Sequence, residues 1–468
     1  MGTDREPRTS DGRGPLLLVF LTTLVICSIG VSTPALWRDE AATVSATQRT
    51  VPELWRLLGH IDAVHGAYYL LVHPLVALFG SGETVLRLPS VLAAACTAAG
   101  VAWLGGRLDG WRTGMLAGLA YALSPMVSRY AQEARSYAIV SALAVLSTCL
   151  LVKTTEKASA QRFAAYGACL ALLGTFNIFG LLIVPAHGLL VWGRHREAVR
   201  GWAVTVAAVA VVLSPLIWLT SRQRDQVSWL PKPSPGEIWV LLSGLTGSAL
   251  LLGPVLLTAG YGLWRAGDLR TFVLAWALIP PVLLLTVSLV TPLYTFRYVL
   301  VCLPAVSLAL GAGLARLSPR WRPVAGVISL VLAVPGHVQL RQQDSRIDDL
   351  RAMASVLRAH ARPGDGLLFD CAADRRVLSP YRSVYRRLID ITLIKSAADA
   401  GNMEGTSAAG AEAATRLRQV DRIWVLSLSD GSACHSDRAD LIQAAGGFSE
   451  RGAGRWRFRG GALLLVSR

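Results

Sequence analysis

The sequence predicts a polytopic α-helical membrane protein with a small C-terminal α/β domain. Of its 468 residues, 53% are hydrophobic and only 16% are charged. The apolar residues also come in long blocks rather than in amphipathic periods. Ordinary soluble domains carry about 25% charged residues, whereas each membrane crossing requires about 20 mostly apolar residues. A soluble fold would have to bury many uniformly apolar helices in one core, so the sequence disfavours that class.

Eleven apolar segments are predicted to cross the membrane. They are 15–34, 88–104, 113–127, 137–152, 163–176, 178–192, 202–219, 249–264, 271–290, 299–315 and 323–340. Arg5, Arg8 and Arg13 precede the first segment, which places the N-terminal tail of residues 1–14 inside the cell. Within 15–340, alternate short loops then carry most of the basic residues, as the positive-inside rule requires. The odd number of spans places the C-terminal region outside the cytoplasmic membrane.

Gly66–Gly80 is a further apolar segment, and its 15 residues are few for a full crossing. A twelfth crossing here would invert every later loop and break the charge pattern. We therefore expect a re-entrant or interfacial helix. The formal net charge of +16 belongs mostly to the short loops. Since no basic groove with interleaved aromatic residues is visible, the charge does not indicate nucleic acid as a partner.

The region 341–468 is predicted to be an extracytoplasmic domain, separate from a transmembrane module at 15–340 that includes an outer loop at 35–86. Its mixture of short apolar runs and amphipathic stretches is typical of an α/β domain. The predicted strands are Gly366–Asp370, Asp421–Ser427 and Ala462–Val466, the predicted helices are Arg346–Ala361 and Ser436–Ala445, and Asn402–Ala414 is predicted to be a mobile loop. Cys371 and Cys434 could form a disulfide if the domain is exported.

The outer loop begins with two adjacent carboxylates, Asp39 and Glu40. A carboxylate beside the membrane surface can act as a general base toward a hydroxyl, or the pair can bind a divalent cation. The alternative is a solvated loop or an ion pair with Arg38. The loop continues with polar residues that are candidates for the wall of a substrate cavity, with interfacial anchoring by the tyrosines as the alternative: His60, Asp62, His65, Tyr68 and Tyr69.

Several arginines lie on the predicted outer face, against the charge bias, and the guanidinium group suits phosphate oxygens. The candidates for phosphate binding are Arg87, Arg129, Arg135 and Arg297. Neighbouring candidates for the cavity wall are Glu133, Tyr137, Tyr294 and Tyr298. An ion pair between Arg129 and Glu133 is the alternative for those two residues. For Arg222 and Arg224 we favour contacts with lipid headgroups.

The order of these motifs resembles the GT-C glycosyltransferases. The motifs are the acidic pair, the Tyr-Tyr segment, Arg-Leu-Pro-Ser (87–90), Arg-Tyr-Ala-Gln-Glu-Ala-Arg-Ser-Tyr (129–137) and Phe-Arg-Tyr (296–298). The resemblance is to the protein O-mannosyltransferase and aminoarabinose-transferase type, especially actinobacterial mannosyltransferases, and it covers about 15–340. One departure is His65-Gly66, where related enzymes often have Pro-Pro, so acceptor handling is expected to differ.

The resemblance implies that a sugar, with mannose as the first candidate, passes from a polyprenyl-phosphate donor to a lipid, glycan or protein acceptor outside the cytoplasmic membrane. It assigns the acidic role to Asp39, with Glu40 beside it, and phosphate contacts to Arg87 and Arg297, then to Arg129 and Arg135. A single displacement would invert the sugar carbon. A divalent cation, with Asp39 and Glu40 as its ligands, stays open.

Two other classes remain as alternatives: a transporter or lipid flippase, and a receptor without catalysis. A transporter often shows paired halves, which are not detected here, and a receptor leaves the acidic pair and the ordered arginines unexplained. Convergence of Asp39, Arg87 and Arg297 on one outward-facing cavity would favour the transferase.

Overall fold

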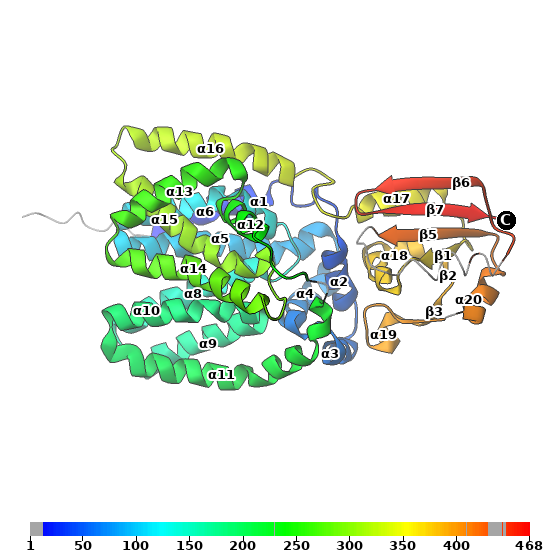
Figure 1. Ribbon diagram of the computed structural model, residues 1–468, viewed down its shortest axis with the longest axis horizontal. Coiled ribbons are helices and arrows are strands. Elements are labelled where there is room, and N and C mark those ends of the chain that lie inside the picture. The colour runs from blue at the N-terminus through cyan, green and yellow to red at the C-terminus, as the bar shows by residue number, and fades with distance from the viewer. Residues whose placement is uncertain (1–12, 229, 409, 429–441, 443–445) are drawn as a thin grey trace, which may run out of the picture. The chain divides into compact units, whose positions relative to one another are not determined.

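The computed structural model describes residues 13–228, 230–408, 410–428, 442 and 446–468, and Figure 1 shows its helices and strands. The chain forms two compact units. The first contains the residues up to Ile29 together with Leu88–Leu340, and the second contains Gly30–Arg87 together with Arg341–Arg468.

The first unit is helical. Its elements are α1 (Arg13–Ser28), α5 (Glu83–Asp109, whose first residues belong to the second unit), α6 (Trp111–Leu123), α7 (Pro125–Ala131), α8 (Tyr137–Glu156), α9 (Ala160–Phe176), η2 (Ile178–Ile183), α10 (Val184–Arg194), η3 (Arg196–Ala198), α11 (Val199–Arg222), η4 (Arg224–Val227), α12 (Gly236–Thr246), α13 (Ala249–Trp264), α14 (Asp268–Ser288), η5 (Phe296–Cys302), α15 (Leu303–Arg316) and α16 (Trp321–Leu340). Each of the eleven predicted apolar segments overlaps one or two of these helices.

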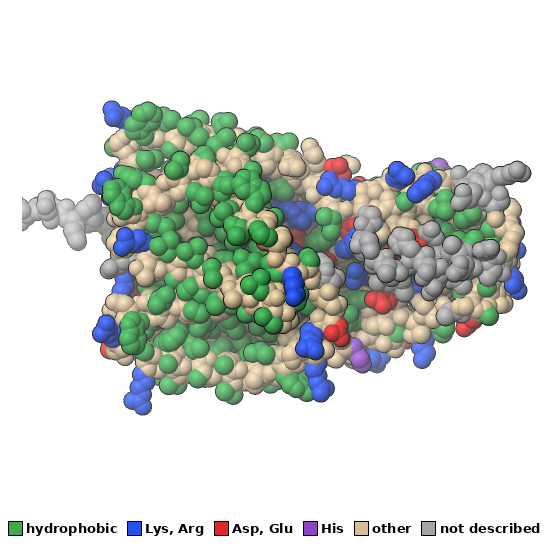
Figure 2. Space-filling view, in the orientation of Figure 1, with side chains coloured by type: hydrophobic (Ala, Val, Ile, Leu, Met, Phe, Trp, Pro, Cys, Tyr) green, Lys and Arg blue, Asp and Glu red, His purple; other side chains and the backbone are tan. Residues whose placement is uncertain are grey.

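The predicted polytopic membrane fold is confirmed. Among the described residues, six helices are long and apolar enough to cross a bilayer, and there are seven if α12 and α13, bent by 75°, count as one span. The other predicted segments form shorter helices, so the number of eleven crossings stays a prediction. Figure 2 shows apolar side chains spread over the visible outer surface of this unit, as a lipid-facing surface requires.

Small residues let the helices of the first unit approach closely. A Cβ atom added to Gly313 of α15 would lie 1.9 Å from the Thr258 carbonyl oxygen of α13, and one added to Gly114 of α6 would lie 2.1 Å from the Ala102 carbonyl oxygen of α5. Such contacts are typical of helices packed inside a membrane, where dispersion rather than water exclusion holds them together.

The second unit combines the outer loop with the C-terminal region. Its elements are α2 (Arg38–Thr47), α3 (Val51–His60), η1 (Ala63–His65), α4 (Gly66–Phe79), α17 (Leu350–His360), β1 (Gly366–Phe369), η6 (Ala372–Tyr381), α18 (Arg382–Tyr385), β2 (Ile389–Asp390), β3 (Leu393–Lys395), α19 (Ala397–Ala400), β4 (Thr406–Ser407), α20 (Gly410–Leu417), β5 (Arg422–Leu428), β6 (Ser449–Phe458) and β7 (Gly461–Ser467). At about 1.5 Å per residue, the 14-residue α4 extends only about 21 Å, which fits the predicted re-entrant or interfacial helix.

A five-stranded sheet with the order β2-β1-β5-β7-β6 forms the core of the second unit. Strand β1 runs parallel to β2 and β5, whereas β7 is antiparallel to β5 and β6. Alternate side chains enter two separate clusters, because successive residues of a strand point to opposite faces. Trp424 and Leu426 lie in one cluster, and Ile423 and Val425 lie in the other.

Most of the predicted C-terminal elements are present, with three differences. The predicted helix Arg346–Ala361 begins later, as α17, because the Asp349 carboxylate caps it by accepting a hydrogen bond from the Ala352 amide at 2.8 Å. The prediction of a mobile loop at Asn402–Ala414 is wrong: this segment contains β4 and the start of α20. Strand β6 was not predicted. The predicted helix Ser436–Ala445, apart from residue 442, lies outside the described residues. So does Cys434, whereas Cys371 is in a disulfide.

Helix α2 belongs to the core of the second unit. Ala41 is fully buried in the same cluster as Trp424. Arg38, at the first position of α2, donates from Nε and Nη2 to the two carboxylate oxygens of Asp348 at 2.9 and 2.8 Å. The compact units therefore differ from the predicted domains, because residues 30–87 pack with 341–468.

Helix α3 is amphipathic and has the capping box that its sequence predicts. The Thr50 amide donates to the Glu53 carboxylate at 2.8 Å, and this hydrogen bond lowers the pKa of Glu53. Leu54 and Leu57 are fully buried, whereas Trp55 is 59% exposed. The apolar face therefore packs inside the unit while an aromatic side chain points away from it.

Candidate active site

The two adjacent carboxylates of the outer loop have different environments. Both lie in the first turn of α2, where the helix N-terminus favours negative charge. Successive residues of a helix point about 100° apart, so the two side chains cannot share one face. The Glu40 side chain is completely buried, whereas Asp39 is only half-buried.

Glu40 is held by Arg87 in a bidentate ion pair. Arg87 donates from Nε to Glu40 Oε1 at 2.8 Å and from Nη2 to Glu40 Oε2 at 2.7 Å, and both side chains are 0% exposed. The other N–H groups donate to three backbone carbonyls of the preceding segment, those of Val31 at 2.7 Å, Pro34 at 2.9 Å and Ala35 at 3.3 Å.

All five N–H donors of Arg87 are therefore engaged within the second unit, since a guanidinium group has five. This geometry assigns Arg87 and Glu40 to the structure of the loop that carries Asp39. It does not support the predicted phosphate contact of Arg87 or a catalytic role for Glu40, and we propose neither. Arg38 is bound to Asp348 in a bidentate ion pair of the second unit.

Of the other cavity candidates in the outer loop, Asp62 and Tyr69 contact each other. This residue has the only positive φ among the described non-glycine residues, at 61°, and its carboxylate accepts a hydrogen bond of 2.8 Å from the buried Tyr69 hydroxyl. The Tyr68 hydroxyl donates to the Leu86 carbonyl at 3.3 Å. His65 lies beside Tyr69, with ring centroids 6.1 Å apart, and the exposed His60 contacts the backbone of its own helix.

In the first unit, the segment 129–137 is fastened to neighbouring helices by two polar side chains. Gln132 is 1% exposed and donates from Nε2 to the carbonyls of Cys27 and Ile29 at 2.9 and 2.8 Å. The Ser90 hydroxyl contacts the carbonyl oxygens of Glu133 and Arg135 at 2.8 and 3.2 Å. Ser90 of the Arg-Leu-Pro-Ser motif and Gln132 of the 129–137 motif therefore have structural roles, because their hydrogen bonds fix the backbone of these segments.

Four side chains of this unit form a row of alternating contacts. The Arg129 guanidinium lies 5.4 Å from the ring centroid of Tyr130, Tyr130 packs edge-on against Tyr137 at 5.5 Å, and Arg297 lies 5.9 Å from the ring of Tyr137. Arg129 also pairs with the buried Glu133. Two of the four predicted phosphate ligands, Arg129 and Arg297, thus stand at the two ends of this row, at half-buried positions.

Arg129, Tyr130, Tyr137 and Arg297 form the cation–aromatic cluster, and two further predicted cavity residues, Tyr294 and Tyr298, lie close to Arg297 in the sequence. Tyr298 stacks on Phe179 of η2 with ring centroids 4.6 Å apart. Tyr294 is 5% exposed, and burial raises its pKa to about 12, helped by the negative charge of Glu237. Its hydroxyl makes no hydrogen bond to the described part of the protein. Arg135 is 6% exposed and more buried than Arg129.

Sequence reasoning missed Tyr130 and Phe179. Tyr130 lies inside the 129–137 motif, and its spacing of seven residues from Tyr137, about two helical turns, is a signal that could identify it. Phe179 gives no signal, because it lies inside a predicted apolar span. Among the residues that the structure describes, no three His, Cys, Asp or Glu side chains are grouped as a metal site, and the Glu40 carboxylate is held by Arg87.

Comparisons with known proteins confirm the predicted resemblance. Residues 67–218 match the family model described as dolichyl-phosphate-mannose-protein mannosyltransferase. The structure is similar to that of ArnT from Cupriavidus metallidurans in the apo state, with a TM-score of 0.65, 14% identity and coverage of 97% of this chain and 98% of that one. ArnT bound to undecaprenyl phosphate matches with the same TM-score and coverage, at 12% identity.

An oligosaccharyltransferase from Archaeoglobus fulgidus, in complex with Zn and sulfate, matches with a TM-score of 0.54 at 10% identity, over 88% of this chain and 68% of that chain. No curated protein sequence matches the chain. At these identities the structural matches show the fold alone, which this chain shares with ArnT and with the oligosaccharyltransferase.

Proposed function

We propose that the protein is a glycosyltransferase that passes a sugar from a polyprenyl phosphate to an acceptor hydroxyl at the outer face of the cytoplasmic membrane. The cation–aromatic cluster of the helical unit is the observation that carries this proposal. The shared fold supports it, since ArnT has been solved with undecaprenyl phosphate bound. In this proposal the C-terminal unit lies outside, as the loop charges predict.

The cluster has the chemistry of a lipid-phosphate site. Arg129 and Arg297 carry two positive charges in this cluster, and we propose Arg135 as a further phosphate contact, because guanidinium groups suit phosphate oxygens. The Arg129 guanidinium lies over the ring of Tyr130, and the Arg297 guanidinium lies over the ring of Tyr137. Beside these apolar rings, a charge-assisted hydrogen bond to phosphate is stronger than in water. Arg297 and Arg129 would stabilise the charge that grows on the leaving phosphate oxygen.

Asp39 is the proposed general base. The acceptor oxygen attacks the anomeric carbon, the bond from that carbon to the phosphate oxygen breaks, and the hydroxyl proton passes to the Asp39 carboxylate. General-base assistance of this kind contributes roughly 10²–10⁴-fold in rate. The Arg87–Glu40 pair positions Asp39, because it anchors the first turn of α2 to the backbone of 31–35.

The state of Glu40 favours inversion at the sugar carbon. A retaining mechanism needs a second carboxylate close to the first, to act as a nucleophile. Both Glu40 oxygens accept hydrogen bonds from Arg87, so this neighbour is unsuited to attack. Mannose is the first sugar to test, because the matching family model carries it in its description. Lipids, glycans and proteins are all candidate acceptors.

The test is to incubate the purified full-length protein with several labelled polyprenyl-phosphate sugars and a membrane extract, and to follow transfer of the label. We expect Asp39→Asn to abolish transfer while the protein still inserts and folds, and Arg297→Ala to weaken donor binding at least tenfold. Arg222→Ala is the matched arginine control, because Arg222 stacks on Trp218 at 4.3 Å within one helix and lies outside the proposed site.

Three results would contradict these assignments. Wild-type turnover by Asp39→Asn would exclude the proposed base. Normal donor affinity in Arg297→Ala would exclude the phosphate contact. Failure of the wild-type protein to transfer any of the sugars, combined with movement of the lipid phosphate across proteoliposome leaflets, would instead favour a flippase.

A further inference from the structure

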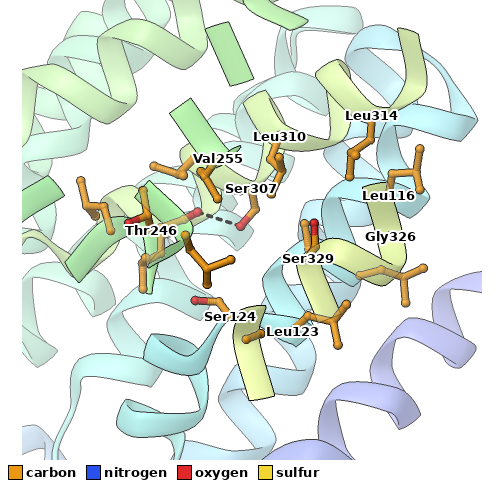
Figure 3. Close-up of a pocket in the computed structure, with 17 residues that line it drawn as sticks. Leu116, Leu123, Ser124, Thr246, Val255, Ser307, Leu310, Leu314, Gly326 and Ser329 are labelled. Carbon is orange, nitrogen blue, oxygen red and sulfur yellow. Dashed lines mark hydrogen bonds between the residues drawn. The ribbon is translucent and has the colours of Figure 1, made fainter. Parts of the chain in front are cut away.

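Helices α9 and α11 of the first unit form an open groove between them. Its volume is about 850 Å³, and Figure 1 shows α11 beside α9 at the edge of the helical unit. Alanine, glycine, valine and threonine make up most of its lining, and Glu197 and Arg200 line one end. The cavity in Figure 3, by contrast, is lined by apolar and hydroxyl side chains such as Leu310 and Ser307, and no charged residue is among those that line it. The groove therefore combines an apolar floor with a charged end.

Two glycines set the floor of the groove, because they let the two helices approach closely. A Cβ atom added to Gly167 of α9 would lie 2.8 Å from Cγ2 of Thr205 in α11, and one added to Gly201 of α11 would lie 2.6 Å from the Phe163 ring of α9. The walls above this floor are open, since Val204 is 63% exposed. A groove with this apolar lining on a lipid-facing surface has room for a hydrocarbon chain.

The groove covers about half of the membrane depth. Its lining extends from Ala160 to Ala171 on α9 and from Arg200 to Val212 on α11, which is about 17 Å at about 1.5 Å per residue, whereas the hydrocarbon core is about 30 Å thick. Beyond this stretch the helices pack together, because a Cβ atom added to Gly174 would lie 2.4 Å from the Leu213 side chain. The length therefore matches the depth of one leaflet and one acyl chain. A membrane-spanning helix of a second copy would need a groove through the whole core.

The charged end of the groove favours an anion. In the predicted topology this end lies inside the cell, because the loop at 194–200 carries three arginines, Arg194, Arg196 and Arg200, against one carboxylate, Glu197. Arg200 is exposed and is the second residue of α11, a position where the helix macrodipole disfavours a cation. In the described structure no side chain caps this helix N-terminus. An anionic group here would interact favourably with both the guanidinium group and the helix N-terminus.

Glu197 narrows the class of anion. Its side chain is 72% exposed, and one carboxylate oxygen lies 3.6 Å from His195 Nδ1. A carboxylate beside Arg200 repels a headgroup with several negative charges, but it can accept hydrogen bonds from hydroxyl groups. A headgroup with one phosphodiester charge and hydroxyl groups beyond it, as in phosphatidylglycerol, suits both residues.

We propose that the α9–α11 groove binds one phosphatidylglycerol molecule of the cytoplasmic leaflet, with an acyl chain along the small residues and the phosphate at Arg200. The site lies in the leaflet opposite to the proposed sugar transfer, so the inference does not depend on that function. Within α11 only Val209 and Leu213 are buried. A lipid in the groove would touch both helices and add contacts that hold α11 to α9.

The test uses native mass spectrometry of the full-length protein with phosphatidylglycerol and phosphatidylcholine of identical acyl chains. We expect the first phosphatidylglycerol to bind at least tenfold more tightly than the first phosphatidylcholine. Arg200→Gln should remove this preference, whereas Arg112→Gln, at the second position of α6, is the matched control and should keep it. Ala164→Leu fills the groove and should weaken phosphatidylglycerol binding at least tenfold. Ala165→Leu should leave it unchanged, because Ala165 is an exposed residue of the same helix that does not line the groove.

A second arm needs no variant. The wild-type protein in lipid nanodiscs is labelled by phosphatidylglycerol with a diazirine at the end of one acyl chain, and peptide mass spectrometry should locate the adducts near Ala171 and Val212, where the groove ends. Adducts confined to other helices would overturn the inference. So would equal affinity for the two lipids, an unchanged preference in Arg200→Gln, or equal weakening by Ala164→Leu and Ala165→Leu. A dimer that Ala164→Leu dissociates without any change in lipid binding would also overturn it, since the groove would then hold a second copy.

Discussion

Replacing Arg87 by alanine should destabilise the second unit severely, and Glu40→Ala should have a similar effect. Arg87→Ala removes five hydrogen bonds and leaves the Glu40 carboxylate without its bidentate partner at a site that is 0% exposed. Breaking a buried ion pair by removing one partner costs about 3–5 kcal/mol. For a unit of this size, that corresponds to a fall in Tm on the order of 10 °C.

Lysine at position 87 separates this structural role from the predicted phosphate contact. A lysine keeps the positive charge, which is sufficient for many phosphate sites. It has at most three donors on one nitrogen and cannot reproduce the planar fork that binds both Glu40 oxygens. We therefore expect Arg87→Lys to lower the Tm nearly as much as Arg87→Ala. Hydrogen exchange of the α2 amides, measured in the same detergent, should rise in all three variants.

The double variant Glu40→Met/Arg87→Met completes a mutant cycle. Since it leaves no unpaired charge, its loss of stability should be smaller than the sum of the two single methionine variants by at least about 2 kcal/mol. Additive losses would show that the two side chains act independently. A normal Tm in Arg87→Ala together with weakened donor binding would refute the reasoning and return Arg87 to the phosphate site.

Three further predictions concern other parts of the chain. Gly313→Ala should lower the free energy of unfolding by about 1–3 kcal/mol, because its Cβ would overlap the α13 backbone. Gly326→Ala should raise the free energy of unfolding by about 0.5–1 kcal/mol. Thermal melts of both variants in one detergent should show a lower Tm for the first and a higher Tm for the second. Tyr294→Phe should leave the Tm unchanged or higher, since the buried hydroxyl makes no hydrogen bond in the described structure, and it should reduce sugar transfer if that hydroxyl donates to the substrate. Ala41→Glu should place a charge in the core of the second unit, so that limited proteolysis cuts the C-terminal region faster than in Ala41→Ser.

The membrane helices could be predicted from the sequence because the signal is a property of whole segments. A run of apolar residues must form a helix inside a bilayer, whatever its neighbours are. Strands β1, β5 and β7 could be predicted for a similar reason, since their residues are apolar on one or both faces. Strand β6 contains three arginines and three glycines or alanines within Ser449–Phe458, and it is held at the sheet edge by backbone pairing with β7.

The wrong prediction at Asn402–Ala414 has a local cause. The small residues of this segment predict a mobile loop, but the Asn402 side chain accepts hydrogen bonds from the amides of Glu404 and Gly405. This turn precedes β4, and a helix follows from Gly410. The composition of the segment does not predict such a turn. The turn depends on one side chain, that of Asn402, which accepts hydrogen bonds from backbone amides.

The acidic pair shows most clearly where sequence reasoning about the site ends. Asp39 and Glu40 are neighbours of the same chemistry, and either could have been assigned as the base. The difference arises from the 100° between successive helix positions and from Arg87, which lies 47 residues further along the chain. Glu40 is held by Arg87 within the fold, and we therefore propose the half-buried Asp39 as the base. The stability of the Arg87→Lys variant therefore tests whether Glu40 is committed to the fold, whereas the turnover of Asp39→Asn tests the base itself.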